Sequence, residues 1–326
     1  MLNTRSNPVL HLLSLVHALL CGLFPLSATA QDYPSKPIRI IVAATPGTAT
    51  DNVARIIAPE MRKVLGQPLV VENKPGADYR IGFEYVARQV PADGYTLLSV
   101  NVEIMALLPV LTRELRFNPI SELPPVAGVA EGKYTMAVPA SSSWKTIGDF
   151  VAQAKANPGK LNFGAASPIG RLSSEQFLNL AGLSLVHVPY SEASRYWVDL
   201  AANEIQMGFV AVGTAITLGQ KTRILAVTGD RRSPQLPDAP TFSELGYAGM
   251  HGLSYSINLR AGTPRATIEK IYAAISQAMQ QAAVAAQLDK FQLEVATETP
   301  EKAQARLTNT VATFSEVAKK VGMKPE

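Results

Sequence analysis

The stretch "VAATPGTATDNVARII", residues 42–57, contains the junction that decides the fold. An apolar run ends at Ala44, a short polar segment with Pro46 and Gly47 follows, and apolar residues then recur at helical spacing. The run "IRIIVAA", residues 38–44, is rich in β-branched residues and apolar except for its arginine, which is typical of a strand covered on both faces. A buried strand that turns directly into an amphipathic helix predicts an α/β sheet.

The same alternation of apolar runs and amphipathic helices continues along the chain. Further strands are expected at residues 68–73, 95–100, 134–139, 161–166, 183–190, 205–212 and 223–229. Helices are expected between them, one of them opened by a capping box from Thr146 to Asp149, and two more close the chain from Pro264 and from Thr299. The pattern predicts two α/β lobes, each a mainly parallel sheet flanked by helices.

The closing helices are expected to pack on the first lobe, which requires the chain to cross between the lobes twice. The predicted boundaries are therefore residues 31–130 together with 253–326 for lobe 1, and residues 131–252 for lobe 2. A chain of 326 residues with 47% hydrophobic side chains is long enough to bury two cores of this kind.

Residues 1–30 have the pattern of a signal peptide. They form an apolar segment with a single charge, Arg5, and they end in an A-x-A cleavage motif at residues 28–30. The prediction is a mature chain that begins at Gln31 in the periplasm. An uncleaved membrane anchor is the alternative, because the apolar stretch is about long enough to span a bilayer. Cys21 is the only cysteine, so the mature chain is predicted to contain no disulfide and no cysteine nucleophile.

Composition and motifs favour a binding protein over an enzyme. The formal charge of +4 comes without a basic cluster interleaved with aromatic residues, so nucleic acid is not an expected partner. The chain has no nucleophile elbow, phosphate loop or dinucleotide fingerprint, and no cluster with metal-ligand spacing. The mature chain has two histidines, His187 in an expected strand and core, and His251 in an expected surface loop. No cofactor and no metal are therefore expected.

The junction after the first strand is a candidate anion site. Unpaired N–H groups and the helix dipole place partial positive charge at a helix start, and Gly47 lets the backbone approach a ligand. The alternative is an ordinary helix start, in which Thr50 caps the helix and Asp51 complements its dipole. The predicted site residues here are Pro46, Gly47, Thr48, Ala49, Thr50 and Asp51, with the main-chain N–H groups of Thr48, Ala49 and Thr50 as the principal donors.

A family resemblance runs from Tyr33 to the C-terminus. The segments "YPSKPIRIIV", "PGTATDNVAR", "VLGQPLVVENKPGADYRIG", "PADGYTLLSV", "PGKLNFGAAS", "HVPY", "RILAVTGDRRSPQLPDAPT" and "AGTP" resemble, in this order, the solute receptors of tripartite tricarboxylate transporters, the Bug family. The resemblance implies a two-lobe periplasmic-binding-protein fold of the Venus-flytrap type, with the ligand between the lobes. It also implies that a small carboxylate is held by backbone groups and ordered water at the loops after the first strand of each lobe.

The chain departs from the family pattern at the expected site. Arg80 and Arg171, if turned inward, would pair directly with a ligand carboxylate, and Glu192 would select an amine or a hydroxyl. The alternative for each is a solvated position on the lip of a loop. The departures are Thr48, Asp78, Tyr79, Arg80, Arg171, Ser191, Glu192 and Val210, and the other predicted contacts in lobe 2 are Ala165, Ala166, Ser167 and Tyr190.

The resemblance implies an extracytoplasmic receptor that captures a small organic acid or amino acid and delivers it to the membrane subunits of a tripartite tricarboxylate-type transporter. A monomer is expected. One alternative is a ligand sensor that signals to a membrane partner, and another is an extracytoplasmic enzyme acting on small acids through carboxylates with perturbed pKa values.

Overall fold

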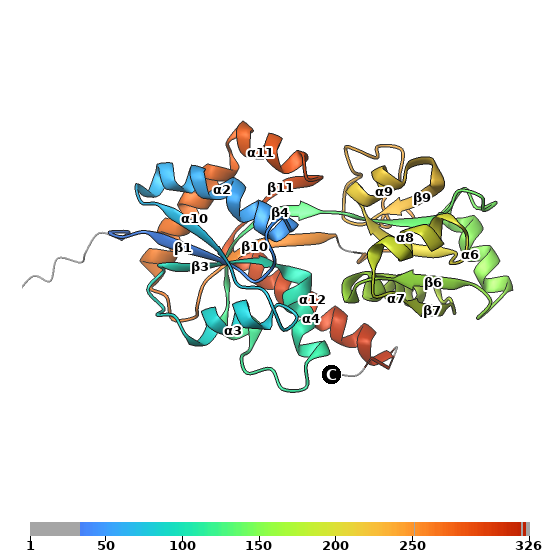
Figure 1. Ribbon diagram of the computed structural model, residues 1–326, viewed down its shortest axis with the longest axis horizontal. Helices are drawn as coiled ribbons and strands as arrows, with labels where there is room; N and C mark the ends of the chain where they lie inside the picture. Colours follow the sequence, from blue (N-terminus) through green and yellow to red (C-terminus); the bar gives the residue numbers. More distant parts are fainter. Residues whose placement is uncertain (1–32, 251, 321, 324–326) are drawn as a thin grey trace, which may run out of the picture. The chain divides into compact units, whose positions relative to one another are not determined.

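The computed structural model describes residues 33–250, 252–320 and 322–323. The predicted signal peptide, with Cys21 and the cleavage site before Gln31, and the loop residue His251 lie outside these residues. The described chain forms two β-sheets with helices packed on them (Figure 1).

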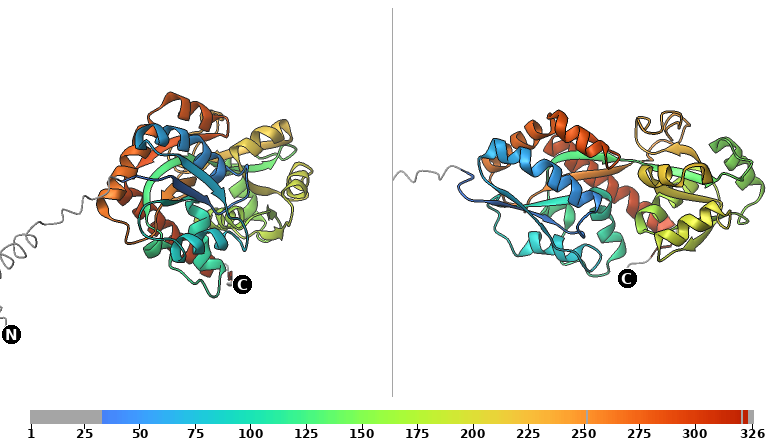
Figure 2. Two further views of the ribbon diagram at one scale, coloured as in Figure 1. Left: turned by 60° about the vertical axis from the view of Figure 1, so that its left-hand side comes forward. Right: turned by 45° about the horizontal axis from the view of Figure 1, so that its top comes forward.

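The first sheet has six strands in the order β11-β4-β10-β3-β1-β2. They are β1 (Ile38–Val42), β2 (Leu69–Asn73), β3 (Thr96–Asn101), β4 (Pro125–Gly132), β10 (Leu253–Asn258) and β11 (Leu293–Glu298). One face of this sheet carries α2 (Ala49–Leu65), α10 (Arg265–Met279) and α11 (Ala282–Asp289) (Figures 1 and 2). The other face carries α3 (Arg80–Arg88), α4 (Val102–Leu111) and α12 (Pro300–Lys320). The short helix α5 (Pro119–Glu122) leads into β4. Because helices cover both faces, every residue of β3 is buried.

The second sheet has five strands in the order β7-β6-β8-β5-β9. They are β5 (Tyr134–Pro139), β6 (Asn162–Ala165), β7 (Val186–Pro189), β8 (Met207–Ala211) and β9 (Thr222–Val227). The helices are α6 (Ile147–Ala156), α7 (Pro168–Ala181), α8 (Ala193–Ala201) and α9 (Val212–Leu218), followed by the single 3-10 turn η1 (Gly219–Lys221). The predicted capping box opens α6, with Thr146 and Asp149 bonded reciprocally.

Side chains of the second sheet alternate between two cores. Phe209 of β8 packs in one cluster with Phe177 of α7, whereas the next residue, Val210, packs in another with Tyr196 of α8. This is the period of two expected of a strand with helices on both faces. The prediction of two α/β lobes is confirmed at the level of the sheets.

Each predicted sheet contains parallel strands, but both sheets are mixed, with antiparallel pairs beside the parallel ones. In the first sheet β1 pairs in parallel with β2 and β3, but β10 is antiparallel to β3 and β4, and β11 is antiparallel to β4. In the second sheet β6 is parallel to β7 and β8, but β5 is antiparallel to β8 and β9. The reason is the connection between the sheets, because β10 and β5 each bring the chain in from the other sheet and so run against the strands they join.

The chain changes sheets between β4 and β5 and returns between β9 and β10. The two segments are tied together, since Tyr134 N–H donates to Thr228 Oγ1 at 2.9 Å and Thr228 N–H donates to the Tyr134 carbonyl at 2.8 Å. The residue limits of the two lobes remain a prediction.

The N-terminal part of α7 also packs against the first sheet's helices. Ile169 and Leu172 are buried in the same apolar cluster as Leu307 and Phe314 of α12. The sequence predicted that α12 packs on the first lobe. It contacts strands of the first sheet and also α7, a helix of the second lobe.

Candidate functional site

The parallel strands of the first sheet end side by side. Val42 at the end of β1 lies opposite Asn73 at the end of β2 and opposite Ser99 near the end of β3. The loops that lead into α2, α3 and α4 therefore start from one edge. Ligands of open α/β sheets bind outside the carboxyl ends of such strands, so a ligand site is expected at this edge of the first sheet.

Thr48 caps the start of α2, so the alternative in which Thr50 caps it is wrong. Thr48 Oγ1 accepts a hydrogen bond from Asp51 N–H at 3.4 Å, and its hydroxyl donates to the Thr45 carbonyl at 3.0 Å. The backbone of Thr48 is extended, as a cap requires, whereas Thr50 is already helical and buried.

Asp51 holds the loop before α2 in place. Its carboxylate, 1% exposed, accepts hydrogen bonds from Gly47 N–H at 2.9 Å, from Asn73 Nδ2 at 2.9 Å and from Arg55 Nε at 2.9 Å. Asn73 also donates to the Ala44 carbonyl at 3.0 Å. Burial opposes the charge, but these donors outweigh it and lower the pKa of Asp51. The carboxylate is thus committed to the protein's own donors.

The donors left for a ligand at α2 are fewer than the sequence predicted. Thr48 N–H donates to the Thr45 carbonyl at 3.4 Å, whereas the N–H groups of Ala49 and Thr50 have no partner in the part of the chain that the structure describes. Gly47 has a φ of +84°, and an added Cβ would meet nothing within 4 Å. A larger residue there would therefore act through backbone strain rather than through a clash with the protein.

The loop before α3 has an unusual backbone. Gly76 has a φ of 121°, and three residues with side chains follow in the left-handed region, with φ 46° at Ala77, 51° at Asp78 and 70° at Tyr79. Arg80 Nε donates to the Ala77 carbonyl at 2.9 Å. The predicted inward pairing of Arg80 with a ligand thus competes with a bond inside its own loop.

At the second sheet the predicted residues form a compact group at the end of β6. Ala165 is buried and its carbonyl accepts from Tyr190 N–H at 3.1 Å. Ser167 caps α7, accepting from Gly170 N–H at 3.1 Å, and Ala166 between them is half-buried. Glu192 is exposed before α8 and makes no capping bond.

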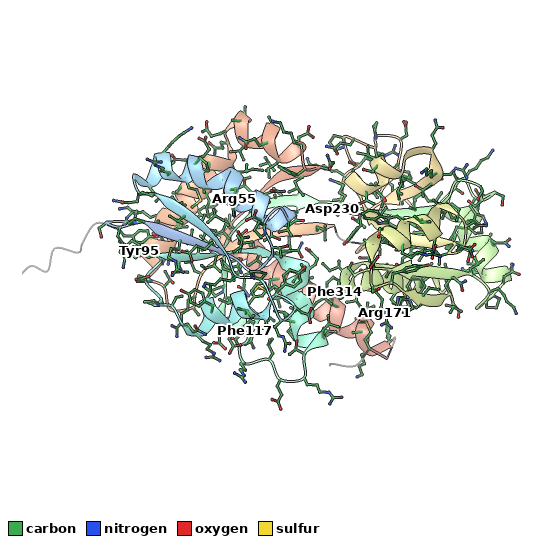
Figure 3. All side chains as sticks on the ribbon, viewed as in Figure 1. Arg55, Tyr95, Phe117, Arg171, Asp230 and Phe314 are labelled. Carbon is green, nitrogen blue, oxygen red and sulfur yellow. The ribbon has the colours of Figure 1, made fainter. Side chains whose placement is uncertain are left out.

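Arg171 lies in the first turns of α7, as Figure 3 shows, and its side chain is 33% exposed. Its nearest acid is Glu175, with Nε and Oε1 3.9 Å apart, and Nε itself is buried without a hydrogen-bond partner among the described residues. Burial, and secondarily the charge of Arg171, lowers the pKa of His187, whose ring lies 5.0 Å from that of Phe163. The expectation of a core histidine is met only in part, because His187 is half-buried and its Nε2 has no hydrogen-bond partner among the described residues.

A buried carboxyl that the sequence did not single out lies where the chain returns to the first sheet. Glu103, 3% exposed in the first turn of α4, accepts from Ser254 N–H at 2.8 Å. Burial raises the pKa of Glu103 to about 7, although the charge of Arg306 opposes the rise. Glu103 lines a small pocket whose other polar residues are Tyr134, Ser173, Gln176, Thr310 and Thr313.

Two tyrosines stand beside Glu103. Tyr134 begins β5 and hydrogen-bonds the side chain of Ser167, and burial raises the pKa of Tyr134 to about 12. Tyr255 of β10 hydrogen-bonds the side chain of Asn101, and burial raises the pKa of Tyr255 as well. The bond between Tyr134 and Ser167 links the start of β5 to the cap of α7.

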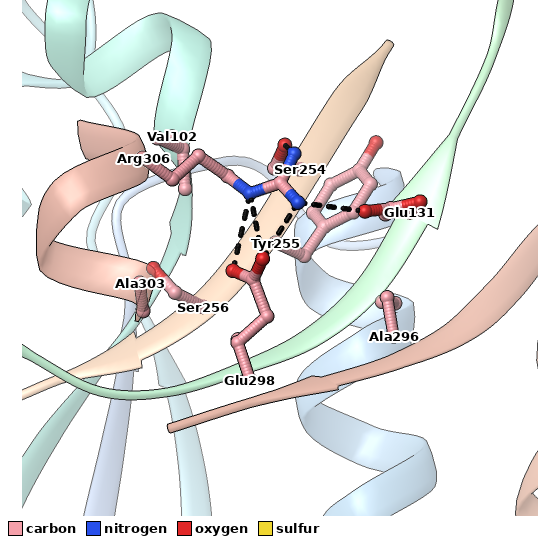
Figure 4. A pocket seen from close by; sticks show the side chains of 11 residues that line it. Val102, Glu131, Ser254, Tyr255, Ser256, Ala296, Glu298, Ala303 and Arg306 are labelled. Carbon is pink, nitrogen blue, oxygen red and sulfur yellow. Dashed lines mark hydrogen bonds and ion pairs between the residues drawn. The ribbon is translucent and has the colours of Figure 1, made fainter. Parts of the chain in front are cut away.

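A second small pocket is filled by an ion cluster around Arg306 (Figure 4). The guanidinium contacts Glu298 at 2.6 Å, Glu131 at 3.0 Å and Ser254 Oγ at 3.3 Å. Glu131 lies on β4 and Ser254 on β10, so Arg306 braces both strands that connect the sheets. Its donors are used within the protein, which makes this pocket a structural feature rather than a ligand site.

Sequence reasoning missed these residues for different reasons. Asn101 carried a signal, because an Asn before the helical pattern of α4 is a common cap, and its Oδ1 does accept from Ile104 N–H at 2.8 Å. Glu103 and Arg306 carried none, since Ser254 lies 151 residues from Glu103 and Glu131 lies 175 residues from Arg306 along the chain.

Within the described ranges, no group of His, Cys, Asp and Glu side chains is placed to hold a metal ion. No helix in those ranges is both long and apolar enough to cross a membrane.

A family model described as "Tripartite tricarboxylate transporter family receptor" matches residues 53–323. The chain belongs to this family. The resemblance identified from the sequence is thereby confirmed, and the protein is a solute-binding receptor with two α/β lobes.

Individual relatives agree with this assignment. The receptor is 31% identical over 280 residues to the UPF0065 protein in the gbd 5′ region of Cupriavidus necator, which covers 85% of each chain. The solved structure of the periplasmic binding protein BugD matches 90% of this chain and 100% of its own, with a TM-score of 0.69 and 27% identity. An R. palustris protein solved with adipate matches 90% of this chain and 100% of its own, with a TM-score of 0.72 and 26% identity.

Proposed function

We propose that this receptor works in the periplasm, after removal of residues 1–30, and that it binds a small carboxylate between its two lobes without turning it over. The carboxylate is held by the N–H groups of Ala49 and Thr50, and the loaded receptor delivers it to the membrane subunits of a tripartite tricarboxylate-type transporter. The chain acts as a monomer and takes an organic acid or an amino acid.

The observation that carries the proposal is the start of α2. A 17-residue helix begins there with two N–H groups that have no partner among the described residues, while Thr48, Gly47 and Asp51 are hydrogen-bonded to one another. A bound anion would accept hydrogen bonds from these two N–H groups, which lie at the positive end of the helix dipole. The family match and the adipate held by the R. palustris protein support a carboxylate as that anion.

The second lobe supplies the other side of the proposed site. Tyr190 N–H bonds the last residue of β6, Ser167 caps the helix that follows, and Arg171 in that helix has a buried Nε without a hydrogen-bond partner among the described residues. We propose that these residues approach the ligand when the lobes close, as in other two-lobe receptors in which the ligand makes contacts with both lobes.

The first experiment is a thermal-shift screen with adipate and other carboxylates, each compared with its neutral amide, such as adipamide. A ligand that binds only the folded chain raises the melting temperature by mass action. The proposal expects carboxylates to raise it and amides not to. Equal stabilisation by both, or no effect of any carboxylate, contradicts the proposal.

The second experiment removes one donor while keeping the helix. Ala49 is the first residue of α2 and Thr48 before it has φ −70° and ψ 160°, so proline at position 49 fits the backbone but carries no N–H. Ala49→Pro should weaken carboxylate binding in calorimetric titration by about tenfold, the loss of one hydrogen bond to a charged group. The control is Ala282→Pro, at the first residue of α11, which should leave binding unchanged.

A further inference from the structure

The loop before α3 keeps a backbone shape that its side chains disfavour. Ala77, Asp78 and Tyr79 follow one another with φ between 46° and 70°, a region that glycine adopts easily and that a bulky residue such as tyrosine rarely adopts. Strain of this kind persists only where the surroundings fix the loop, and it concentrates at functional sites.

The surroundings do fix this loop. At its start, Lys74 N–H donates to the Val42 carbonyl at 2.8 Å. At its end, the backbone of Gly82 lies so close to β1 that an added Cβ would come within 2.6 Å of Ala43 Cβ. The Arg80 side chain also binds the Ala77 carbonyl, as described above. The loop is thus held at the edge of the sheet beside the start of α2, and Tyr79 is held with it.

The Tyr79 side chain lies near two tyrosines of the strands that connect the sheets. Its side chain is 37% exposed, and it adds to the rise in pKa of both Tyr134 and Tyr255, which places the three phenols near one another. The hydroxyls of Tyr134 and Tyr255 are bonded to Ser167 and Asn101. For the hydroxyl of Tyr79, no partner is present in the described part of the chain, so its ring and hydroxyl are available to a ligand.

The cations near this edge are already engaged. Arg55 pairs with Asp51, Arg80 binds the Ala77 carbonyl, and the Lys74 ammonium lies 4.5 Å from the centre of the Tyr85 ring. If the α2 start takes one carboxylate, the part of the ligand that lies against Tyr79 meets an aromatic face. Such a surface favours a planar aromatic group.

We propose that Tyr79 is a specificity-determining residue, and that through it the receptor prefers carboxylates carrying an aromatic ring to aliphatic carboxylates of the same size. This inference rests on the proposed function, because it assumes that the carboxylate sits at the start of α2.

The test compares benzoate with cyclohexanecarboxylate, which have the same number of carbon atoms and one carboxylate each but differ in planarity. Calorimetric titration should give the parent chain about a tenfold preference for benzoate, the size expected of one aromatic pair. Tyr79→Gly should reduce the ratio of the two affinities to about one, and Tyr79→Phe should keep it.

Stability provides a second readout that separates a selective role from a packing role. Tyr79→Gly relieves left-handed strain and should raise the melting temperature while it removes the preference for benzoate. The matched control is Asp78→Gly, which relieves strain at the neighbouring residue and should leave the affinity ratio as in the parent. A tyrosine that only packs against the fold would lower the melting temperature when replaced and leave the ratio unchanged.

The outcomes also separate this inference from the proposed function. Ala49→Pro should weaken the binding of benzoate and of cyclohexanecarboxylate by the same factor. The ratio of the two affinities should therefore stay the same although both affinities fall. Binding of adipate with no measurable binding of benzoate, or an unchanged ratio in Tyr79→Gly, overturns the role of Tyr79 and leaves the proposed function standing. If no carboxylate binds at all, both proposals fail.

Discussion

Helices α2 and α4 follow neighbouring parallel strands and begin in similar ways, yet their buried acids differ. Each has a polar cap, Thr48 or Asn101, and each carries a carboxyl in its first turn that is almost fully buried, Asp51 at 1% and Glu103 at 3% exposure. The pKa of Asp51 is lowered, whereas that of Glu103 is raised to about 7.

The difference lies in the balance between burial and donors, since burial is the largest single influence on both pKa values but prevails only at Glu103. Asp51 receives hydrogen bonds from the Arg55 guanidinium, the Asn73 amide and the Gly47 N–H. Glu103 receives hydrogen bonds from the N–H and the side chain of Ser254 and from its own backbone, but no cation bonds it directly, and the charge of Arg306 contributes least. The pKa of a buried carboxyl falls where its donors and a bonded cation outweigh the cost of burial, and it rises where they do not. The α2 start is thus a closed ionic network, and the α4 start is a site that changes charge near neutral pH.

The largest expected effect is the pH dependence that Glu103 gives to the free energy of unfolding. Its pKa rises from 4.5 in the unfolded chain to about 7 in the folded chain, so the folded state holds the extra proton between these values. Stability from this group is therefore fully present below pH 4.5 and is lost as the pH rises through 7, by about 3 kcal/mol in total. Urea unfolding at several pH values measures this loss.

The comparison variant is Glu103→Gln, which keeps the size and the acceptor for Ser254 N–H but does not titrate. The free energy of unfolding of the parent should fall relative to this variant as the pH rises from 5 to 7. His187 and Glu175 also have shifted pKa values, but they are the same in both proteins and cancel in the difference. If the free energy of unfolding changed with pH equally in the two proteins, the raised pKa of Glu103 would be contradicted.

A smaller effect is expected where the network is closed. Asp51→Ala removes the acceptor shared by Gly47, Asn73 and Arg55, and should lower the free energy of unfolding by about 2 kcal/mol at pH 7, because donors are left without partners. Because the pKa of Asp51 is lowered, its contribution is present above its unfolded pKa of 3.8 and is lost as the pH falls through the folded value. A variant as stable as the parent at pH 7 would show that the network adds nothing.

The smallest expected effect is shared by the two caps. Thr48→Ala and Asn101→Ala each remove one side-chain acceptor from a helix start, and each should cost about 1 kcal/mol of unfolding free energy. Thr48 and Asn101 do not titrate. Both variants should therefore keep the pH dependence of the unfolding free energy that Glu103 contributes. A change in that pH dependence in Thr48→Ala would mean that the two helix starts are not independent.

The sequence predicted the features that depend on neighbours in the chain. The strand before α2, the capping box at Thr146 and the helical faces follow from local patterns, and they appear where they were expected. The strands β4, β10 and β11 were missed because they connect or edge the sheets, and their pairing partners lie far along the chain.

At the candidate site the limit of prediction was the same. The α2 loop was visible as a polar junction, but Asp51 could not be recognised as its brace because Asn73 lies 22 residues away on β2. The left-handed backbone at Tyr79 was also hidden, since three consecutive residues with side chains in that region run against local preference.

The most direct measurement of the central claim is a crystal structure of the receptor with a carboxylate identified by the thermal-shift screen. The account predicts that one carboxylate lies at the start of α2, with its oxygens about 2.9 Å from the N–H nitrogens of Ala49 and Thr50, and that Asp51 keeps its bonds to Gly47 and Asn73. A carboxylate bound elsewhere, for instance on Arg171 alone, with the α2 donors left to water, would contradict it.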